Sequence, residues 1–136
     1  SASFGKATDA SAEANGLVQL DCDAAAITLS GDVITSCVID SVQAKVNFDA
    51  SGVVAEIGAM LTKGQLGEAY GMKKNGSTYE WNEQVAFFCD YVTGKTVDQV
   101  MNIAVNEKTA PTDADIGSTV TIAVGGFQSL IAKAAK

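Results

Sequence analysis

Two long stretches of β-type sequence, joined by a short turn, dominate the first half of this chain. Leu17 to Leu29 alternates with the period of a half-buried strand, and one of its faces carries Val18, Leu20, Cys22, Ala24 and Ala26. Val33 to Phe48 is rich in β-branched residues, and Ser30-Gly31-Asp32 between the two stretches suits a two-residue hairpin loop. A second turn at 49–52 leads to a shorter strand at Val53 to Ile57. The pattern therefore predicts an antiparallel meander of three strands.

The later part of the chain has helical spacing instead. Four apolar residues form one helical stripe: Trp81, Val85, Phe88 and Val92. Gly94 is a natural stop for that helix, and Thr96-Val97-Asp98-Gln99 has the spacing of a capping box that begins a short second helix. A terminal helix is expected from near Ser118 to Lys133, where an internal Gly125-Gly126 pair suggests close approach of another backbone or of a flat ligand. Strands followed by helices predict an α+β fold, an antiparallel sheet with helices packed on one face.

Composition sets limits on what the chain does. At 136 residues, 47% of them hydrophobic, it has the length of one domain with a real core. Its net charge of −7 and its lack of a basic run argue against nucleic-acid binding, since phosphate contacts need clustered Lys and Arg. No apolar stretch is long enough to cross a bilayer. The Ser/Ala/Gly/Asp-rich segment 1–15 is predicted to be a flexible tether, and 16–136 a single domain.

The cysteines do not form a disulfide framework, because there are three of them: Cys22, Cys37 and Cys89. The hairpin turn is expected to set Cys37 opposite about Ala26, which is unsuitable for a bond to Cys22. Free, half-buried thiols are therefore predicted. The chain has no histidine and no cysteine pair at metal-ligand spacing, which excludes most zinc, haem and triad chemistry.

A loop rich in acids and hydroxyls precedes the terminal helix. Pro111, the only proline, is followed by Asp113, Asp115 and a Ser/Thr cluster around Gly117. The first turn of a helix leaves backbone N–H groups without partners and favours negative charge, so a phosphate suits this place. The alternative is an ordinary helix cap by Asp115 or Ser118.

The spacing Asp115-x-x-Ser118-x-x-Thr121, followed by an apolar helix, resembles the flavin-attachment motif of FMN-binding domains. These domains occur in sodium-pumping NADH:quinone reductase, in the related Rnf complexes and in surface lipoproteins of anaerobic Gram-positive bacteria. The family pattern is Asp-x-x-Ser-Gly-Ala-Thr/Ser, and a flavin transferase joins FMN through a phosphoester to the last hydroxyl. The resemblance implies that Thr121 is the acceptor, although Thr119 and Val120 stand where the family has Gly and Ala.

A second block, Tyr70 to Lys73 with Glu80 to Gln84, resembles a recurring segment of the Gram-positive relatives. A flavin ring needs flat apolar faces and a few hydrogen-bonding groups at its pyrimidine edge. The candidates for stacking are Tyr70, Met72, Tyr79 and Trp81, and those for the polar edge are Asn82 and Gln84. Lys63, Lys73 and Lys74 form a positive cluster that either faces a phosphate or is ordinary solvated surface. The alternative for the aromatic residues is a place in the core.

The combined prediction is a flavin-binding electron-transfer module with FMN as cofactor. Its predicted site residues are Tyr70, Met72, Trp81, Asp115, Gly117, Ser118, Thr119 and Thr121. The module is expected outside the cell membrane, tethered by a signal or lipid anchor that precedes Ser1, and served by a membrane-associated redox partner. The alternative is a non-redox surface domain of the same fold that has lost flavin and binds another small ligand or acts structurally. No paired base and nucleophile are present, so a carrier or binding role is favoured over catalysis by the chain itself.

Overall fold

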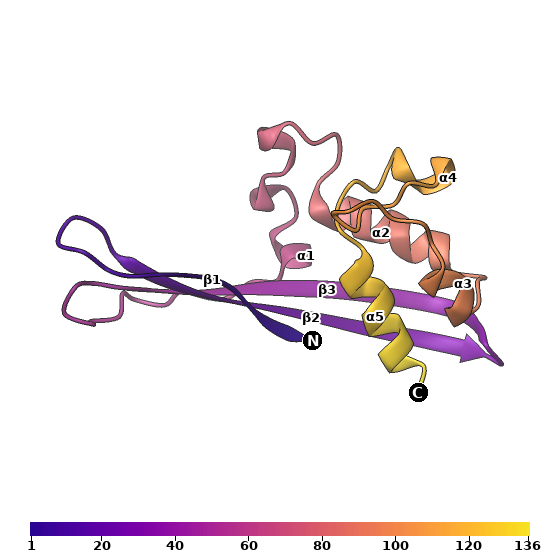
Figure 1. Ribbon diagram of the computed structural model, residues 1–136, viewed down its shortest axis with the longest axis horizontal. Helices are drawn as coiled ribbons and strands as arrows, with labels where there is room; N and C mark the ends of the chain where they lie inside the picture. The colour runs from indigo at the N-terminus through magenta and orange to yellow at the C-terminus, as the bar shows by residue number, and fades with distance from the viewer.

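A long antiparallel hairpin forms the base of the molecule (Figure 1). The computed structural model describes residues 1–136, and in it β2 (Gly16–Ser30) pairs with β3 (Val33–Phe48) along their whole lengths, from Gly16 opposite Phe48 to Ser30 opposite Val33. Gly31 has a φ of +63°, which its lack of a side chain permits and which the tight loop requires. The predicted hairpin and its turn are confirmed.

The third strand of the sheet comes from the N-terminus rather than from Val53 to Ile57. β1 (Ala2–Thr8) pairs antiparallel with β2, and the sheet order is β1-β2-β3. The prediction that all of 1–15 is a flexible tether is therefore wrong for β1. Every residue of β1 is exposed, so backbone pairing rather than burial makes this strand, and the hydrophobic pattern gave no sign of it.

The expected strand at Val53 to Ile57 starts but does not continue. Val54 forms an isolated bridge with Phe48, and the Ala55 amide donates to the carbonyl of Asn47. Asp49 builds the preceding turn by accepting hydrogen bonds from the amides of Ser51 and Val53. Beyond Ala55 the chain leaves the sheet, and the ladder ends.

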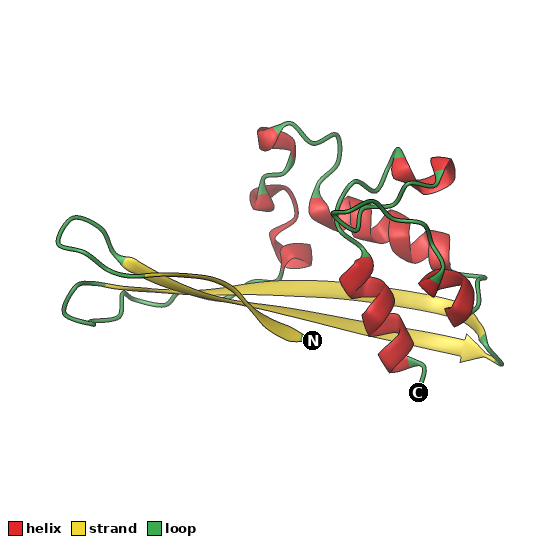
Figure 2. Ribbon diagram, viewed as in Figure 1, coloured by secondary structure: helices red, strands yellow, loops and turns green.

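All helices lie over one half of the hairpin and on one face of the sheet (Figure 2). They are α1 (Lys63–Leu66), the 3-10 helices η1 (Gly67–Tyr70) and η2 (Lys73–Asn75), α2 (Trp81–Val92), α3 (Val97–Met101), α4 (Ala114–Gly117) and α5 (Gly125–Ala134). α2 packs on β3 and α5 packs on β2. The α+β class is thus confirmed.

The core lies between the sheet and these helices. The predicted stripe of α2 is buried in full: Trp81, Val85, Phe88 and Val92. It packs with Ile34 and Ile39 of β3 and with Phe127 and Ile131 of α5. The strand face predicted from Cys22, Ala24 and Ala26 is turned away from the helices, because the half-buried residues of β2 that pack on the core are Ala25, Ile27 and Leu29.

The terminal helix begins at Gly125, not near Ser118. The chain first forms the short helix α4 and then runs without regular structure to Val124. The run Thr119 to Ile122 contains four β-branched residues in succession, which disfavour a helix. The Gly125-Gly126 pair consequently lies in the first turn of α5 rather than in its interior, where the conformational cost of glycine would be higher.

Candidate functional site

A groove lies at the N-terminal end of α5, and we call it the α5 groove. It encloses about 410 Å³. Its lining residues come from β2, α1, η1, α2 and α5 and from two connecting loops: Asp23, Lys63, Tyr70, Met72, Trp81, Ile122, Ala123, Gly126 and Phe127. Three of the predicted site residues, Tyr70, Met72 and Trp81, are therefore brought together from separate segments.

Hydrogen bonds and ring packing hold the aromatic walls of the groove. Trp81 is the first residue of α2, is 5% exposed, and meets the ring of Phe127 edge to face at 6.2 Å between centroids. The hydroxyl of Tyr70 donates to Gln43 Oε1 of β3 at 3.3 Å. Both rings thus keep fixed positions while part of each borders the groove.

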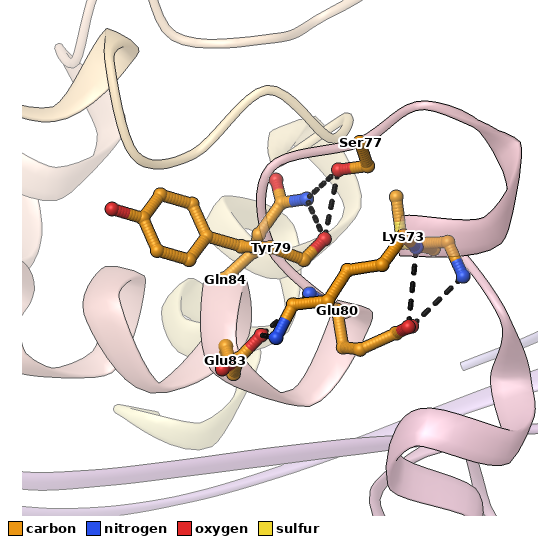
Figure 3. A network of polar contacts seen from close by, with 7 residues as sticks. Lys73, Ser77, Tyr79, Glu80, Glu83 and Gln84 are labelled. Carbon is orange, nitrogen blue, oxygen red and sulfur yellow. Dashed lines mark hydrogen bonds and ion pairs between the residues drawn. The ribbon is translucent and has the colours of Figure 1, made fainter.

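Glu80 fixes the segment that carries Met72 (Figure 3). Glu80 is 2% exposed, and its carboxylate accepts hydrogen bonds from the amides of Met72, at 2.8 Å, and Lys73, at 3.1 Å. Glu83 in turn accepts from the Glu80 amide at 2.7 Å and forms an ion pair with Lys73 at 2.8 Å. That hydrogen-bonded pair raises the pKa of Lys73 and lowers the pKa of Glu83. The network attaches the Met72 loop to the start of α2.

Lys63 brings a positive charge into the groove. Its ammonium nitrogen lies 5.2 Å from the ring centroid of Tyr70 and also 5.2 Å from that of Trp81. Two aromatic faces therefore hold one cation between them. Asp23 is the acidic residue of the lining, so the groove offers one charge of each sign.

The first turn of α5 has no side-chain cap. The amides of Gly125, Gly126 and Phe127 have no hydrogen-bond partner within the chain, and a methyl group added at Gly126 would meet open space. Since Gly126 and Phe127 line the α5 groove, the unpaired donors of a helix N-terminus lie at its edge.

The amides of the loop predicted to bind an anion instead donate to a side chain of the protein itself, that of Gln84. Gln84, 1% exposed, accepts through Oε1 from the amides of Thr121, at 2.8 Å, and Ile122, at 3.2 Å. The same oxygen accepts from the hydroxyl of Thr121 at 3.2 Å. The Gln84 amide nitrogen donates to Ser77 Oγ and to the carbonyl of Tyr79 (Figure 3). The prediction of free amides at Thr121 is wrong, and Gln84 is fully used, so it is not available to a ligand's polar edge.

Of the five remaining predicted site residues, three border a second, smaller hollow and two border neither hollow. Ser118, Thr119 and Thr121 border a space of about 160 Å³ against the segment 76–79. Asp115 and Gly117 border neither hollow, and the side chain that caps α4 is that of Asp113 rather than Asp115 or Ser118.

Three residues considered for the flavin site lie outside the α5 groove: Tyr79, Asn82 and Thr121. Tyr79 packs against Phe87 at 5.0 Å and does not line the groove. Asn82 Oδ1 is buried without a hydrogen-bond partner. Thr121 is exposed, and its neighbour Ile122 lines the α5 groove, so the two hollows meet at this peptide link.

Sequence reasoning missed four groove residues: Asp23, Ile122, Ala123 and Phe127. The alternation of β2 contained a signal for Asp23, because a carboxylate shares its face with the half-buried Ala25 and Ile27. A charged residue on the helix-facing side of a strand indicates a polar opening in the layer above it.

No group of three or more His, Cys, Asp or Glu side chains is arranged to hold a metal ion. No helix combines the length and apolar character needed to cross a membrane. No family model, curated protein or solved structure gives a significant match to this chain.

Proposed function

We propose that this chain is an FMN-binding electron-transfer module and that the α5 groove holds the flavin. The observation that supports the proposal best is the meeting of two aromatic walls, Tyr70 and Trp81, with the uncapped first turn of α5 in one groove. Small-molecule sites combine flat apolar surface with a few convergent polar groups in this way. The proposal rests on this chemistry together with the motif resemblance.

Each part of the groove has a matching part of the ligand. Trp81 and Tyr70 would border the flavin ring, which would displace the ammonium of Lys63 from their faces, and Met72 would pack against the edge of the ring. The amides at the start of α5 would bind the phosphate, with the ammonium of Lys63 balancing its charge. Asp23 is an acceptor suited to the imide N–H of the ring.

Covalent attachment would compensate for the low phosphate affinity expected at this site. The chain is acidic and the groove has no arginine, so a dianionic phosphate gains little from charge pairing. Thr121 is an exposed residue that directly precedes the groove residue Ile122, so a phosphoester on its hydroxyl would tether the flavin beside its groove.

Thr119 is a second candidate acceptor. The capping aspartate of α4 is Asp113, and counting the family pattern from Asp113 aligns Gly117 with the family glycine and Thr119 with the acceptor. Thr119 is half-buried and its hydroxyl donates to the carbonyl of Ile116 at 3.1 Å. The hydroxyl of Thr121 also donates, to Gln84 Oε1 at 3.2 Å, but Thr121 is the more exposed residue. Accessibility favours Thr121, and the pattern counted from the cap favours Thr119.

Bound flavin would supply the capacity to take up and release one or two electrons. The chain would contribute position, a partly apolar wall and the Lys63 charge, which favours the electron-rich form of a ring beside it. We further propose an extracellular or cell-surface location and a membrane-associated redox partner.

A non-redox surface domain of the same fold is the second candidate. The observation in its favour is Gln84, which takes the amides of Thr121 and Ile122 that would otherwise receive a ligand. Such a domain would use the α5 groove for another small, flat, anionic molecule.

Co-expression with a flavin transferase separates the two functions. We expect yellow protein whose mass increases by one FMN less one water, and we expect Thr121→Ala to lose the adduct while Thr119→Ala keeps it. The opposite pattern would move the acceptor to Thr119 and leave the function intact. Colourless protein of unchanged mass that also fails to take up free FMN would rule out the redox function.

A further inference from the structure

The face of the sheet that is turned away from the helices is almost entirely apolar, and we call it the open face. Ala25, Ile27 and Leu29 of β2 pack on the core, so the alternate residues of β2 and their directly opposite partners on β3 lie on the open face. These cross-strand pairs are Gly16–Phe48, Val18–Val46, Leu20–Ala44, Cys22–Val42, Ala24–Asp40 and Ala26–Val38. β1 adds Ala2 beside Cys22 and Phe4 beside Leu20.

The open face is in contact with solvent. Phe4 is 82% exposed, Val38 61% and Val18 37%, and Cys22 is a free, half-buried thiol. Gly16, which is buried, lies against the ring of Phe48. A continuous exposed apolar surface that spans three strands is unusual on a monomer and is typical of an interaction site.

The two faces of the hairpin differ even at the end that lies beyond the helices (Figure 1). There the side of the sheet that faces the helices elsewhere carries Gln19 opposite Lys45, whereas the open face carries Val18 opposite Val46. A hairpin end with both sides in water gains nothing from keeping one side apolar, because an antiparallel sheet alternates in this way where one of its faces is covered. The pattern therefore indicates that an apolar surface covers the open face.

The one charged side chain of the open face is held at its edge. Oδ1 of Asp40 accepts hydrogen bonds from the amides of Ser41, at 2.8 Å, and Gly64 of α1, at 3.1 Å. Since β3 is an outer strand of the sheet and α1 packs on it, this contact draws the carboxylate toward the helices. The net charge of −7 is thus carried elsewhere, and two copies of the chain can meet at their open faces without bringing acids together.

We propose that two copies of this chain pack open face to open face as a symmetric dimer, with a two-fold axis between the two sheets. The same surface then serves both partners, as such symmetry requires. Sheets pack face to face about 10 Å apart, and the small side chains of Ala24, Ala26 and Ala44 leave room for the larger ones of the other copy. The α5 groove opens on the other side of the sheet, so the dimer does not depend on flavin binding.

Size and charge both favour a second copy as the occupant. A strand rise of about 3.4 Å and a strand spacing of about 4.8 Å give the open face roughly 35 by 15 Å, so that two copies bury roughly 1,000 Å² in total. This area reaches the lower limit of a specific interface, and we expect a dissociation constant on the order of 10 μM. An anionic lipid surface, by contrast, attracts basic residues, and the open face has none.

Sedimentation velocity of the full chain over a concentration range that brackets this dissociation constant tests the proposal. The mass should rise with concentration from that of one chain to that of two. Val18→Glu and Val38→Glu each place a carboxylate on the open face and should weaken the dimer by about tenfold or more. Asn47→Glu adds the same charge on the opposite face and should leave the dimer unchanged.

The near-ultraviolet circular dichroism of Trp81, which is buried in the core, shows whether each variant is folded. Val38, as the more exposed of the two valines, keeps the test valid if Val18→Glu does not fold. A chain that stays monomeric over the whole range would overturn the proposal, and binding of that monomer to phosphatidylcholine vesicles would assign the open face to a lipid surface instead. A dimer that both open-face variants leave intact, or that Asn47→Glu weakens equally, would also overturn it.

Discussion

The backbone amides at the two ends of the segment 121–127 differ in whether they have hydrogen-bond partners. At Thr121 and Ile122 the amides are satisfied by the buried side chain of Gln84. At Gly125 and Gly126, one turn later, they have no partner and the helix has no side-chain cap. An amide near a helix start is thus free for a ligand only where no buried side chain already accepts from it.

The strongest test of this contrast is Gln84→Leu, which removes the acceptor and keeps an apolar side chain of similar size. Three donors of the 121–122 segment lose their partner, and Ser77 and Tyr79 lose a donor. We expect the free energy of unfolding to fall by about 3 kcal/mol, measured by urea denaturation. Gln99→Leu, at an exposed capping position, should lower it by less than about 1 kcal/mol. Equal losses in the two variants would mean that Gln84 does not hold the loop.

The two glycines at the start of α5 allow a finer comparison. A methyl group at Gly126 meets open space, whereas one at Gly125 would lie 3.1 Å from Thr109 Cβ. We expect Gly126→Ala to raise the free energy of unfolding by about 0.5 kcal/mol, through its helix propensity, and Gly125→Ala to give no gain. Thermal denaturation of the pair measures this difference. Equal gains would show that the turn is looser than its contacts indicate.

The smallest expected effect is on the stability of the protein at high pH, and it involves Tyr91 and Asp113, the N-cap residue of α4. Burial, and then the charge of Asp113, raise the pKa of Tyr91, whose hydroxyl donates to that carboxylate at 3.3 Å. Between the ordinary tyrosine pKa, about 10, and the raised value, the unfolded state releases a proton that the folded state keeps, so stability falls as pH rises. Tyr91→Phe should flatten the decline of the melting temperature between about pH 9.5 and 11. An unchanged slope would remove Tyr91 as its source.

Local sequence signals predicted the elements whose partners lie nearby in the chain. Gly31 with Asp32 gave the hairpin, and the stripe from Trp81 to Val92 gave α2 with its buried face. Tyr70 and Trp81 were predicted as neighbours of one ligand, and they do border one groove. Gly31 permits the tight turn of the hairpin, and the apolar residues of the stripe favour burial, so these signals are contained in the residue types themselves.

The errors come from long-range hydrogen bonds, which leave no periodic trace. Gln84 lies 37 positions from Thr121 and accepts from two amides of the segment before Gly125, which had been predicted as part of the helix. β1 pairs through its backbone alone, with exposed side chains, so its sequence resembles a linker. Such bonds depend on which segments the fold brings together, and only the structure identifies them.

The single tryptophan gives the most direct test of the α5 groove, because Trp81 lines it. Titration with FMN should quench its emission to saturation, after correction with free N-acetyltryptophanamide for absorbed light, and riboflavin, which has no phosphate, should bind more weakly. Gly126→Asp places a carboxylate at the uncapped turn and should weaken FMN binding about fivefold or more without changing riboflavin binding. Ala134→Asp, with the same added charge at the other end of α5, should leave both unchanged. Emission that FMN does not quench, or equal affinity for the two flavins that Gly126→Asp leaves untouched, would contradict a phosphate-binding flavin site at this helix.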